Sequence, residues 1–389
     1  MLRLFVLVSL LHLYIGLRLI PDLASVAPAL AFAAAAYLLA SSTLIPLAML
    51  SRRMSAARGT RMVWVPWTGF VAMGAFSSLF VLTALRDVAL LAGGTADMFL
   101  PIDAALERFR VLSAAGIPLL AALITVIGFF NARRRAAVRE VDVAIAGLPA
   151  ALEGFTIAQI SDIHVGATIR RGYVSAIVDA VNALKPDLIA VTGDIVDGSV
   201  EQLAAHTEPL GRLSARHGAF FITGNHEYYS GAHAWITEMQ RLGLVVLMNE
   251  HRVLDHDGAD MLVAGINDFS AEHFDPSHKS DPAAALSGAP ADAAFRLLLA
   301  HQPRSAFAAK GLGFHLQLSG HTHGGQFVPW IWFVRLQQPF TAGLHRLGGL
   351  DGLWVYVSRG TGYWGPPKRF GAPSEITLLR LKAVAAGNG

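Results

Sequence analysis

Two histidines stand one residue apart in a glycine-rich stretch, His321 and His323 in "SGHTHGGQ". Near neutral pH, imidazole nitrogens serve as metal ligands or as proton carriers. The glycines on either side let the backbone pass close to an ion or a phosphate, and they permit turns with positive φ. The pair therefore indicates a turn that contributes ligands to a chemical site.

Polar residues of the same kind follow four other apolar runs along the chain. They are Asp162 and His164 in "SDIH", Asp194 and Asp197 in "GDIVD", Asn225 and His226 in "GNHE", and His301 after "RLLLA". Taken alone, "GDIVD" reads equally well as an ordinary carboxylate turn, and "GNH" as a hairpin turn. Together, each directly after an apolar run, they predict one site assembled from several strand ends.

The spacing within these motifs suggests how ligands pair. In an extended strand, residues i and i+2 point the same way. Asp162 and His164 are therefore expected to reach one ion together, and so are His321 and His323 if their turn stays extended. Nine other histidines are interpreted as ordinary polar side chains: His206, His217, His233, His251, His256, His273, His278, His315 and His345.

The chain contains no cysteine, which excludes disulfides, thiolate catalysis and cysteine-based zinc or iron–sulfur sites. A metal must then be held by His, Asp, Glu or Asn, a donor set that suits Mn, Fe, Zn or Mg. The formal net charge of +3 argues neither for nor against nucleic acid, and no nucleic-acid partner is expected.

The first third of the 389-residue chain is strongly apolar. The whole chain is 53% hydrophobic and only 15% charged, whereas soluble domains are nearer a quarter charged. Segments Leu4–Ile20, Leu23–Leu50, Val63–Leu85 and Val111–Phe130 are each long enough to span a membrane. The first could be the core of a signal peptide, but a second long apolar run follows it instead of a cleavage site, which favours a retained helix. We predict an all-α transmembrane region over residues 1–130.

Arginines in the short loops predict the orientation. Nine of them fall on one side of the predicted spans: Arg3, Arg52, Arg53, Arg58, Arg61, Arg133, Arg134, Arg135 and Arg139. Arg18, Arg86, Arg108 and Arg110 fall on the other, offset by nearby acidic residues. We therefore expect a multi-pass protein of a bacterial inner membrane, with its N-terminus and its second half in the cytoplasm; one miscounted span would reverse the second half.

From about residue 141 the sequence pattern changes. Apolar runs typical of strands end in polar residues, and helical patterns lie between them. This alternation predicts an α/β layered domain with its site at the strand ends. We assign residues 131–150 to a basic linker and entry segment, and residues 151–383 to the domain.

The ordered motifs "DIH", "GDIVD", "GNHE" and "GHTHGGQ" resemble those of the calcineurin-like metallophosphoesterase superfamily. "LQLSGHTHGGQ" and "YVSRGTGYWGPPKRFGAPSEITLL" are similar to its bacterial, often membrane-linked branch. The resemblance covers about Phe155–Leu381, and it implies a β-sandwich flanked by helices in four layers, αββα. It says little about the substrate.

The same resemblance implies two divalent metal ions. Asp162, His164 and His323 would hold one ion; Asn225, His301 and His321 would hold the other; and Asp194 would bridge them. His226 would face the phosphate, and Asp197 would orient a ligand from behind. Many members have "GNHD" where this chain has "GNHE", so Glu227 is expected to be a supporting variation.

A pair of such cations can activate water for in-line attack on phosphorus. The resemblance therefore implies a membrane-anchored metallophosphoesterase that hydrolyses a phosphodiester or pyrophosphate bond of a small-molecule or lipid substrate, with manganese among the candidate metals. Two alternatives stay open: a phosphomonoesterase of broad specificity, and a non-catalytic membrane receptor or scaffold. A transporter would need ionisable residues within its membrane spans. The four predicted spans contain only His12 and Arg18, which argues against a transporter.

Two segments near the C-terminus carry further expectations. Arg359, Lys368 and Arg369 lie among glycines and aromatic residues, and are candidates for substrate contact, or else solvated charges of a crossover loop. Phe327–Phe340 is apolar but too short to span a membrane. It is interpreted either as an interfacial contact through which a lipid substrate enters or as a buried strand.

Overall fold

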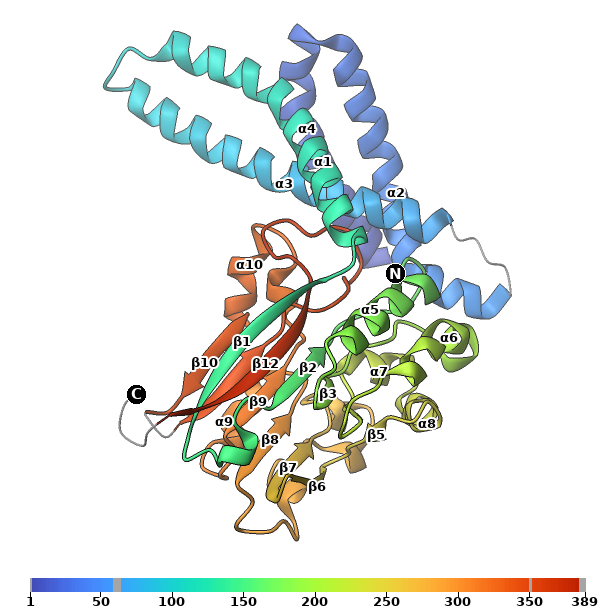
Figure 1. Cartoon of the computed structure of the whole chain (residues 1–389). Coiled ribbons are helices and arrows are strands. Elements are labelled where there is room, and N and C mark those ends of the chain that lie inside the picture. Colours follow the sequence, from blue (N-terminus) through green and yellow to red (C-terminus); the bar gives the residue numbers. More distant parts are fainter. Residues whose placement is uncertain (1, 59–63, 350–351, 385–389) are drawn as a thin grey trace. The chain divides into compact units, whose positions relative to one another are not determined.

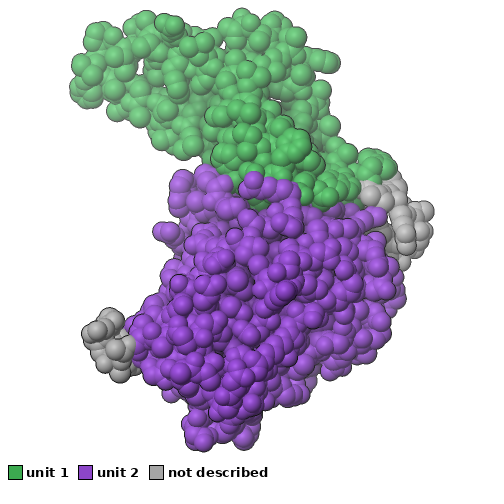
Figure 2. All heavy atoms as spheres, viewed as in Figure 1, with its two compact units in different colours: residues 1–133, 365–370 green, residues 134–364, 371–389 purple. Residues whose placement is uncertain are grey.

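The computed structural model describes residues 2–58, 64–349 and 352–384. Two compact units make up the chain (Figures 1 and 2). Unit 1 consists of residues 1–133 and 365–370, and unit 2 of residues 134–364 and 371–389. A short C-terminal segment thus belongs to the same unit as the N-terminal third of the chain.

Four long helices form most of unit 1. They are α1 (Leu2–Val26), α2 (Pro28–Arg58), α3 (Trp64–Asp97) and α4 (Asp103–Arg133). All four are long and apolar enough to cross a membrane, which confirms the predicted helical region. Two predicted features, Arg61 and the start of the third span at Val63, lie outside the described residues.

An ionic network inside unit 1 differs from the prediction. Arg86 was expected in a loop, but α3 continues well past it, and its side chain is 2% exposed. The guanidinium donates to the carboxylate of Asp22 in α1, to Ser113 Oγ in α4, and to the backbone oxygens of Arg18 and Arg110. α3 therefore extends beyond the predicted third span, which ends at Leu85. These partners satisfy the hydrogen-bonding groups and the charge of the buried guanidinium.

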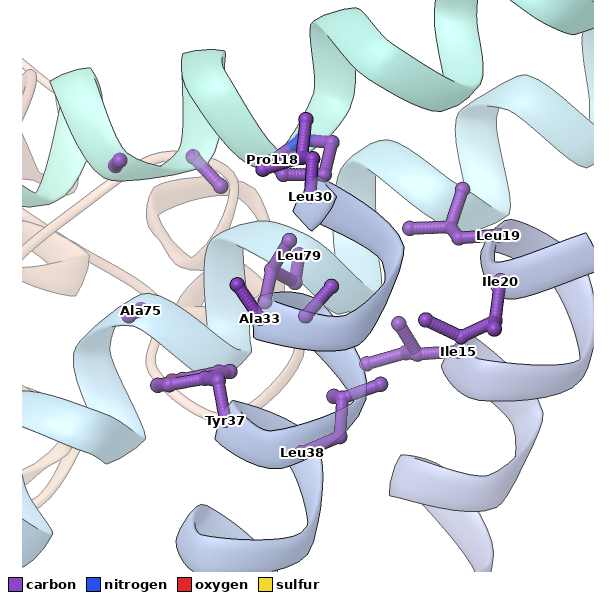
Figure 3. A pocket seen from close by; sticks show the side chains of 13 residues that line it. Ile15, Leu19, Ile20, Leu30, Ala33, Tyr37, Leu38, Ala75, Leu79 and Pro118 are labelled. Atoms are coloured by element: carbon purple, nitrogen blue, oxygen red, sulfur yellow. The ribbon is translucent and has the colours of Figure 1, made fainter. Parts of the chain in front are cut away.

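An apolar cavity of about 230 Å³ lies within unit 1 (Figure 3). All four helices line it, with Ile15 from α1, Leu30 from α2, Leu79 from α3 and Pro118 from α4 among the contributors. Water needs several polar partners to occupy a cavity, and this lining is almost entirely hydrocarbon. The lining therefore favours apolar groups over water in this cavity.

The C-terminal segment of unit 1 is packed against α3 and α4. Lys368 is 1% exposed, and its ammonium donates to the backbone oxygen of Gly74 at 2.8 Å and to Ser78 Oγ. The amide of Arg369 donates to the backbone oxygen of Gly128 at 2.8 Å. A Cβ at Gly128 would come within 2.7 Å of Lys368 Cγ, so this glycine makes room for the lysine stem.

Two six-stranded sheets form unit 2 (Figure 1). The first has the order β1 (Ala137–Ala146), β12 (Glu375–Val384), β2 (Thr156–Ile160), β3 (Leu188–Val191), β4 (Ala219–Phe221) and β5 (Val245–Val246). The second has the order β10 (Gly343–Leu347), β11 (Leu353–Val357), β9 (Leu316–Ser319), β8 (Phe295–Leu299), β7 (Ala259–Gly265) and β6 (Glu250–His256). Within segment 131–150, β1 pairs in parallel with β12 along ten residues.

The main core lies between the two sheets. Ile157 and Phe220 from the first sheet pack with Val263, Leu297 and Leu318 from the second, and all five are at most 2% exposed. A second cluster covers the other face of the second sheet. Helices of unit 2 are α5 (Arg171–Ala183), α6 (Val200–Thr207), α7 (Asn225–Ser230), α8 (Ala232–Arg241), α9 (Ala306–Ala309) and α10 (Trp330–Phe333). Mixed sheets with flanking helices confirm the predicted fold class.

Candidate metal centre

The predicted site residues follow the ends of five strands, β2, β3, β4, β8 and β9. Within the first sheet β2, β3 and β4 run parallel, and within the second β8 and β9 do. Parallel strands bring their carboxyl ends to one edge. Backbone hydrogen bonds then join the loops: Asp162 N donates to Gly193 O at 3.0 Å, and Gly320 N donates to His301 O at 2.9 Å.

The loop backbone is not extended, so strand alternation does not aim the i and i+2 pairs, although Asp162 and His164 do fall in one group as expected. Five predicted ligands have positive φ between 52° and 69°: Asp162, His164, Asp194, His321 and His323. Such conformations cost about 1–3 kcal/mol each for residues other than glycine, and they persist only where surrounding structure enforces them. Left-handed turns, rather than strand alternation, aim these side chains.

The side chains gather into overlapping groups of three, and two of these groups consist of predicted metal ligands alone. In the first, His164 Nε2 lies 2.9 Å from His323 Nε2, and His323 Nε2 lies 3.4 Å from Asp162 Oδ1. In the second, His301 Nε2 lies 3.2 Å from Asp194 Oδ2 and 3.3 Å from His321 Nδ1.

The two histidines of "GHTHGG" therefore belong to different groups and do not share one group. The divided arrangement agrees with the resemblance and not with the simple spacing argument. The roles of these residues as ligands stay a prediction.

Asp194 connects the two groups. Its Oδ2 is 4.0 Å from His164 Nε2 in the first group and 3.9 Å from His226 Nε2. Asp197 lies behind both imidazoles, with Oδ1 at 2.6 Å from His226 Nδ1 and 3.3 Å from His164 Nδ1. One carboxylate thus orients two rings so that their Nε2 atoms face Asp194.

The donor set fits a metal ion on two counts. Asn225 is buried, and among the described residues its Oδ1 has no hydrogen-bond partner, so a ligand role would satisfy it. Gly224 and Gly320 approach the carboxylates so closely that a Cβ would lie 2.2 Å from Asp194 Oδ1 and from Asp162 Oδ2, respectively. The backbone at these two glycines therefore lies in direct contact with the two carboxylates.

The electrostatics of the predicted ligands differ from one another. Burial raises the pKa of Asp162. Burial also opposes ionisation of Asp194, but the charges of His301 and His226 outweigh it and hold the pKa of Asp194 well below its usual range. Burial lowers the pKa of His321 to about 3, which leaves the neutral imidazole that binds metals.

Glu227 has a larger part in the site than a supporting variation would suggest. It is fully buried, and its carboxylate accepts four backbone amides: Gly224 N at 2.7 Å, Asp194 N at 2.9 Å, Ile195 N at 2.8 Å and Val196 N at 3.3 Å. Burial and the charge of Asp194 raise the pKa of Glu227 to about 7, whereas the amides favour its anion. This side chain ties the Asp194 loop to the Asn225 loop.

Three neighbours of the site were not singled out from the sequence. Asp268 is buried near His301, burial raises its pKa, and it accepts from Gln302. The rings of Tyr229 and Trp364 pack edge-on against His226, with centroids at 5.1 and 5.7 Å. Asp268 follows an apolar run just as the other site residues do, so the same rule could have found it; the two aromatic contacts had no comparable signal.

The three basic candidates for substrate contact have other surroundings. Arg359 pairs with Glu375 at 2.9 Å in unit 2. Lys368 and Arg369 are buried in unit 1. Their contact with substrate stays a prediction.

The segment 327–340 holds α10 and a following 3-10 turn, so its interpretation as a buried strand is wrong. It exposes Trp332, Phe333 and Leu336 at 60%, 53% and 83% of their surfaces. A strand does not form because its backbone turns directly after the ligand loop: a Cβ at Gly325 would meet Ile331 Cα at 2.2 Å.

Known proteins are similar to this chain in sequence. Residues 155–325 match the family model described as calcineurin-like phosphoesterase. A metallophosphoesterase of Campylobacter jejuni is 32% identical over 70% of this chain and 70% of its own length, and one of Bacillus subtilis is 32% identical over 61% and 82%.

The chain belongs to the calcineurin-like metallophosphoesterases. A zebrafish protein named as a transmembrane protein with metallophosphoesterase domain is 37% identical over 68% of this chain and 61% of its own length. This chain thus spans a little under two thirds of the first relatives that it matches. With its four apolar helices, it is a membrane protein.

Membership of the metallophosphoesterases implies divalent metal ions, and the two groups of ligands are where this chain could hold them.

Proposed function

We propose that this protein is a membrane-anchored, dinuclear metal-dependent phosphohydrolase that acts on a phosphodiester or pyrophosphate bond. One observation carries the proposal: two three-ligand groups meet at Asp194, and His226 Nε2 faces the same carboxylate oxygen at 3.9 Å. When bound, divalent cations would neutralise phosphoryl oxygens and acidify water for attack. Manganese, iron, zinc and magnesium all suit this cysteine-free donor set.

His226 is the residue best placed to move a proton. Asp197 holds its Nδ1 at 2.6 Å, which fixes the ring and presents Nε2 to the centre of the site. Tyr229 and Trp364 pack against the ring and limit its rotation. A histidine oriented in this way can donate a proton to the leaving oxygen of a phosphate ester.

The surface beside the ligand loop favours an amphiphilic substrate. Trp332, Phe333 and Leu336 expose apolar side chains seven to eleven residues after Gly325 in that loop. Tryptophan is enriched where proteins meet the headgroup region of a membrane. These side chains would bind the apolar part of a lipid-linked phosphate while the polar part enters the site.

The positive-inside rule supports a cytoplasmic position for unit 2 in a bacterial inner membrane. Arg133 ends α4, and Arg134, Arg135 and Arg139 follow it directly. Soluble and lipid phosphates of the cytoplasmic face would then be its substrates.

The test is a hydrolysis panel with the full-length protein in detergent micelles. An aryl monoester, an aryl diester and a lipid pyrophosphate are each assayed with Mn²⁺, Zn²⁺, Mg²⁺ or chelator. We expect diester or pyrophosphate cleavage that chelation abolishes and that His226→Ala lowers at least 10²-fold. Cleavage of the monoester alone would favour the phosphomonoesterase alternative, and no turnover with any metal would favour the receptor.

Lipid preference has its own test. Leu336→Ser should lower turnover of the lipid pyrophosphate several-fold and leave the aryl diester unchanged. Val253→Ser is the matched control, since Val253 is an exposed aliphatic residue on β6, 41% accessible. Equal loss on both substrates, or loss in the control, would contradict a lipid-binding surface.

A further inference from the structure

We propose that unit 2 holds a second, separate metal site for a borderline cation such as Zn²⁺, formed by His233, Asp275 and His278. One ligand atom from each lies within 4.8 Å of the others. His233 Nε2 is 2.9 Å from Asp275 Oδ2, and His278 Nε2 is 3.9 Å from the same oxygen. Both histidines had been interpreted as ordinary polar side chains, and the inference does not depend on the proposed hydrolysis.

The ligands come from two different elements of the chain. His233 lies in the first turn of α8, whereas Asp275 caps the short 3-10 helix Pro276–His278 and His278 ends it. An ion would therefore connect α8 to the segment around residues 274–278. Three protein ligands from two elements, with one position left to water, is a common arrangement for zinc.

Two of the three ligands are already oriented by other groups. Tyr228 Oη lies 3.0 Å from His278 Nδ1, so the Nε2 atom of that ring turns toward Asp275. Ser277 donates to Asp275 Oδ1 from its amide at 2.9 Å and from its hydroxyl at 2.6 Å, so Oδ2 faces the histidines. Metal-binding histidines and carboxylates are characteristically held in this way through their second polar atom.

The donor chemistry selects the class of ion. Two imidazoles and one carboxylate suit zinc and neighbouring transition metals, whereas Mg²⁺ and Ca²⁺ prefer oxygen ligands alone. The imidazole of His233 is 75% exposed, so an ion reaches the site from solvent and keeps a water ligand. The alternative is a plain ion pair between His233 and Asp275 without a metal.

A bound ion would affect aromatic residues that border the candidate metal centre at Asp194. Phe274, next to Asp275, packs against Tyr228 and Tyr229, with ring centroids at 6.0 and 5.4 Å. Tyr229 in turn packs against His226 at 5.1 Å. An ion that fixes the segment carrying Phe274 would therefore restrict the motion of Tyr229, and through it the motion of the His226 ring.

The test counts metal ions. Full-length protein is stripped with chelator, dialysed against about 1 µM free Zn²⁺ and analysed for zinc per chain by mass spectrometry. Because His233 is exposed, His233→Ala should fold normally and bind one equivalent fewer than the wild type. His273→Ala is the matched control: it removes an exposed histidine of the same segment that lies outside the cluster, and it should bind as the wild type does.

A second variant tests the orienting contact. Tyr228→Phe keeps the ring and removes the hydroxyl from His278, and it should weaken zinc binding at this site about 10–100-fold. An unchanged zinc count in His233→Ala would overturn the proposal and leave only the ion pair. Equal losses in His233→Ala and His273→Ala would also overturn it, because the loss would then not be specific to the cluster.

Discussion

Glu227→Gln is the substitution that most sharply probes how the metal centre is held. Glutamine keeps the size and shape of the side chain but replaces one carboxylate oxygen by an NH₂ group. In this protein Oε1 accepts from Ile195 N and Val196 N, and Oε2 accepts from Asp194 N and Gly224 N. In either orientation of the glutamine amide, its NH₂ group takes the place of one oxygen. The two buried backbone N–H groups that donated to that oxygen then face a donor and lose their acceptor.

The magnitude follows from those four bonds. A hydrogen bond to a charged group contributes about 1.5–3 kcal/mol, so losing two costs about 3–6 kcal/mol of unfolding free energy. Stabilities of whole domains are about 5–15 kcal/mol. For a unit of this size, about 1 kcal/mol lowers Tm by 2–4 °C. The expected fall in Tm is therefore about 6–24 °C.

Thermal unfolding of the full-length protein in detergent, followed by circular dichroism, measures this fall. Glu272→Gln makes the same chemical change at an exposed position and should shift Tm by less than about 2 °C. Metal affinity of Glu227→Gln should also drop about 10–100-fold, because the loops of Asp194 and Asn225 lose their common anchor. A Tm within 2 °C of the wild type, with unchanged metal affinity, would refute the reasoning.

Four further changes follow from the same contacts. Gly320→Ala places a methyl group 2.2 Å from Asp162 Oδ2 and should abolish metal binding; full metal content measured by mass spectrometry would contradict this. Asp197→Asn should lower kcat at least 10²-fold with little change in KM, because His226 loses the carboxylate charge that favours its protonated, proton-donating form; equal kcat in steady-state assays would count against it. Chelation should lower Tm, since bound ions stabilise only the folded protein; an unchanged melting curve would argue against resident metals. Arg86→Met removes the buried partner of Asp22, leaves it only the longer contact with Arg110 at 3.7 Å, and should cost about 3–5 kcal/mol, measured as lowered thermal stability in detergent; wild-type stability would show that the network is dispensable.

The residue types at the strand ends were predictable from the sequence. Parallel strands bring their carboxyl ends together, so Asp162, Asp194, His301 and His321 could be placed in one site from apolar runs alone. Asp268 follows an apolar run in the same way and was overlooked only because its motif is short. The four apolar helices were equally clear, since their length and composition are local properties of the chain.

Other features depend on contacts between distant residues. Left-handed φ values at Asp162 and His323 are enforced by neighbouring loops and leave no local pattern. Residue Ala137 pairs with Glu375, a partner that no local periodicity reveals. Burial of Lys368 depends on the absence of a side chain at Gly128, and the four bonds to Glu227 depend on loops from two strands. Tertiary structure, not propensity, decides each of these.

The central claim is that Asp194 and its two ligand groups hold cations that activate water beside His226. Its most direct test is the rate at which the full-length protein hydrolyses an aryl phosphodiester before chelation, after chelation and after Mn²⁺ is added back. We expect chelation to reduce hydrolysis to background, and Mn²⁺ to restore it in the wild type but not in Asp194→Asn. Hydrolysis that persists after complete removal of metal, or full activity in Asp194→Asn, would contradict it.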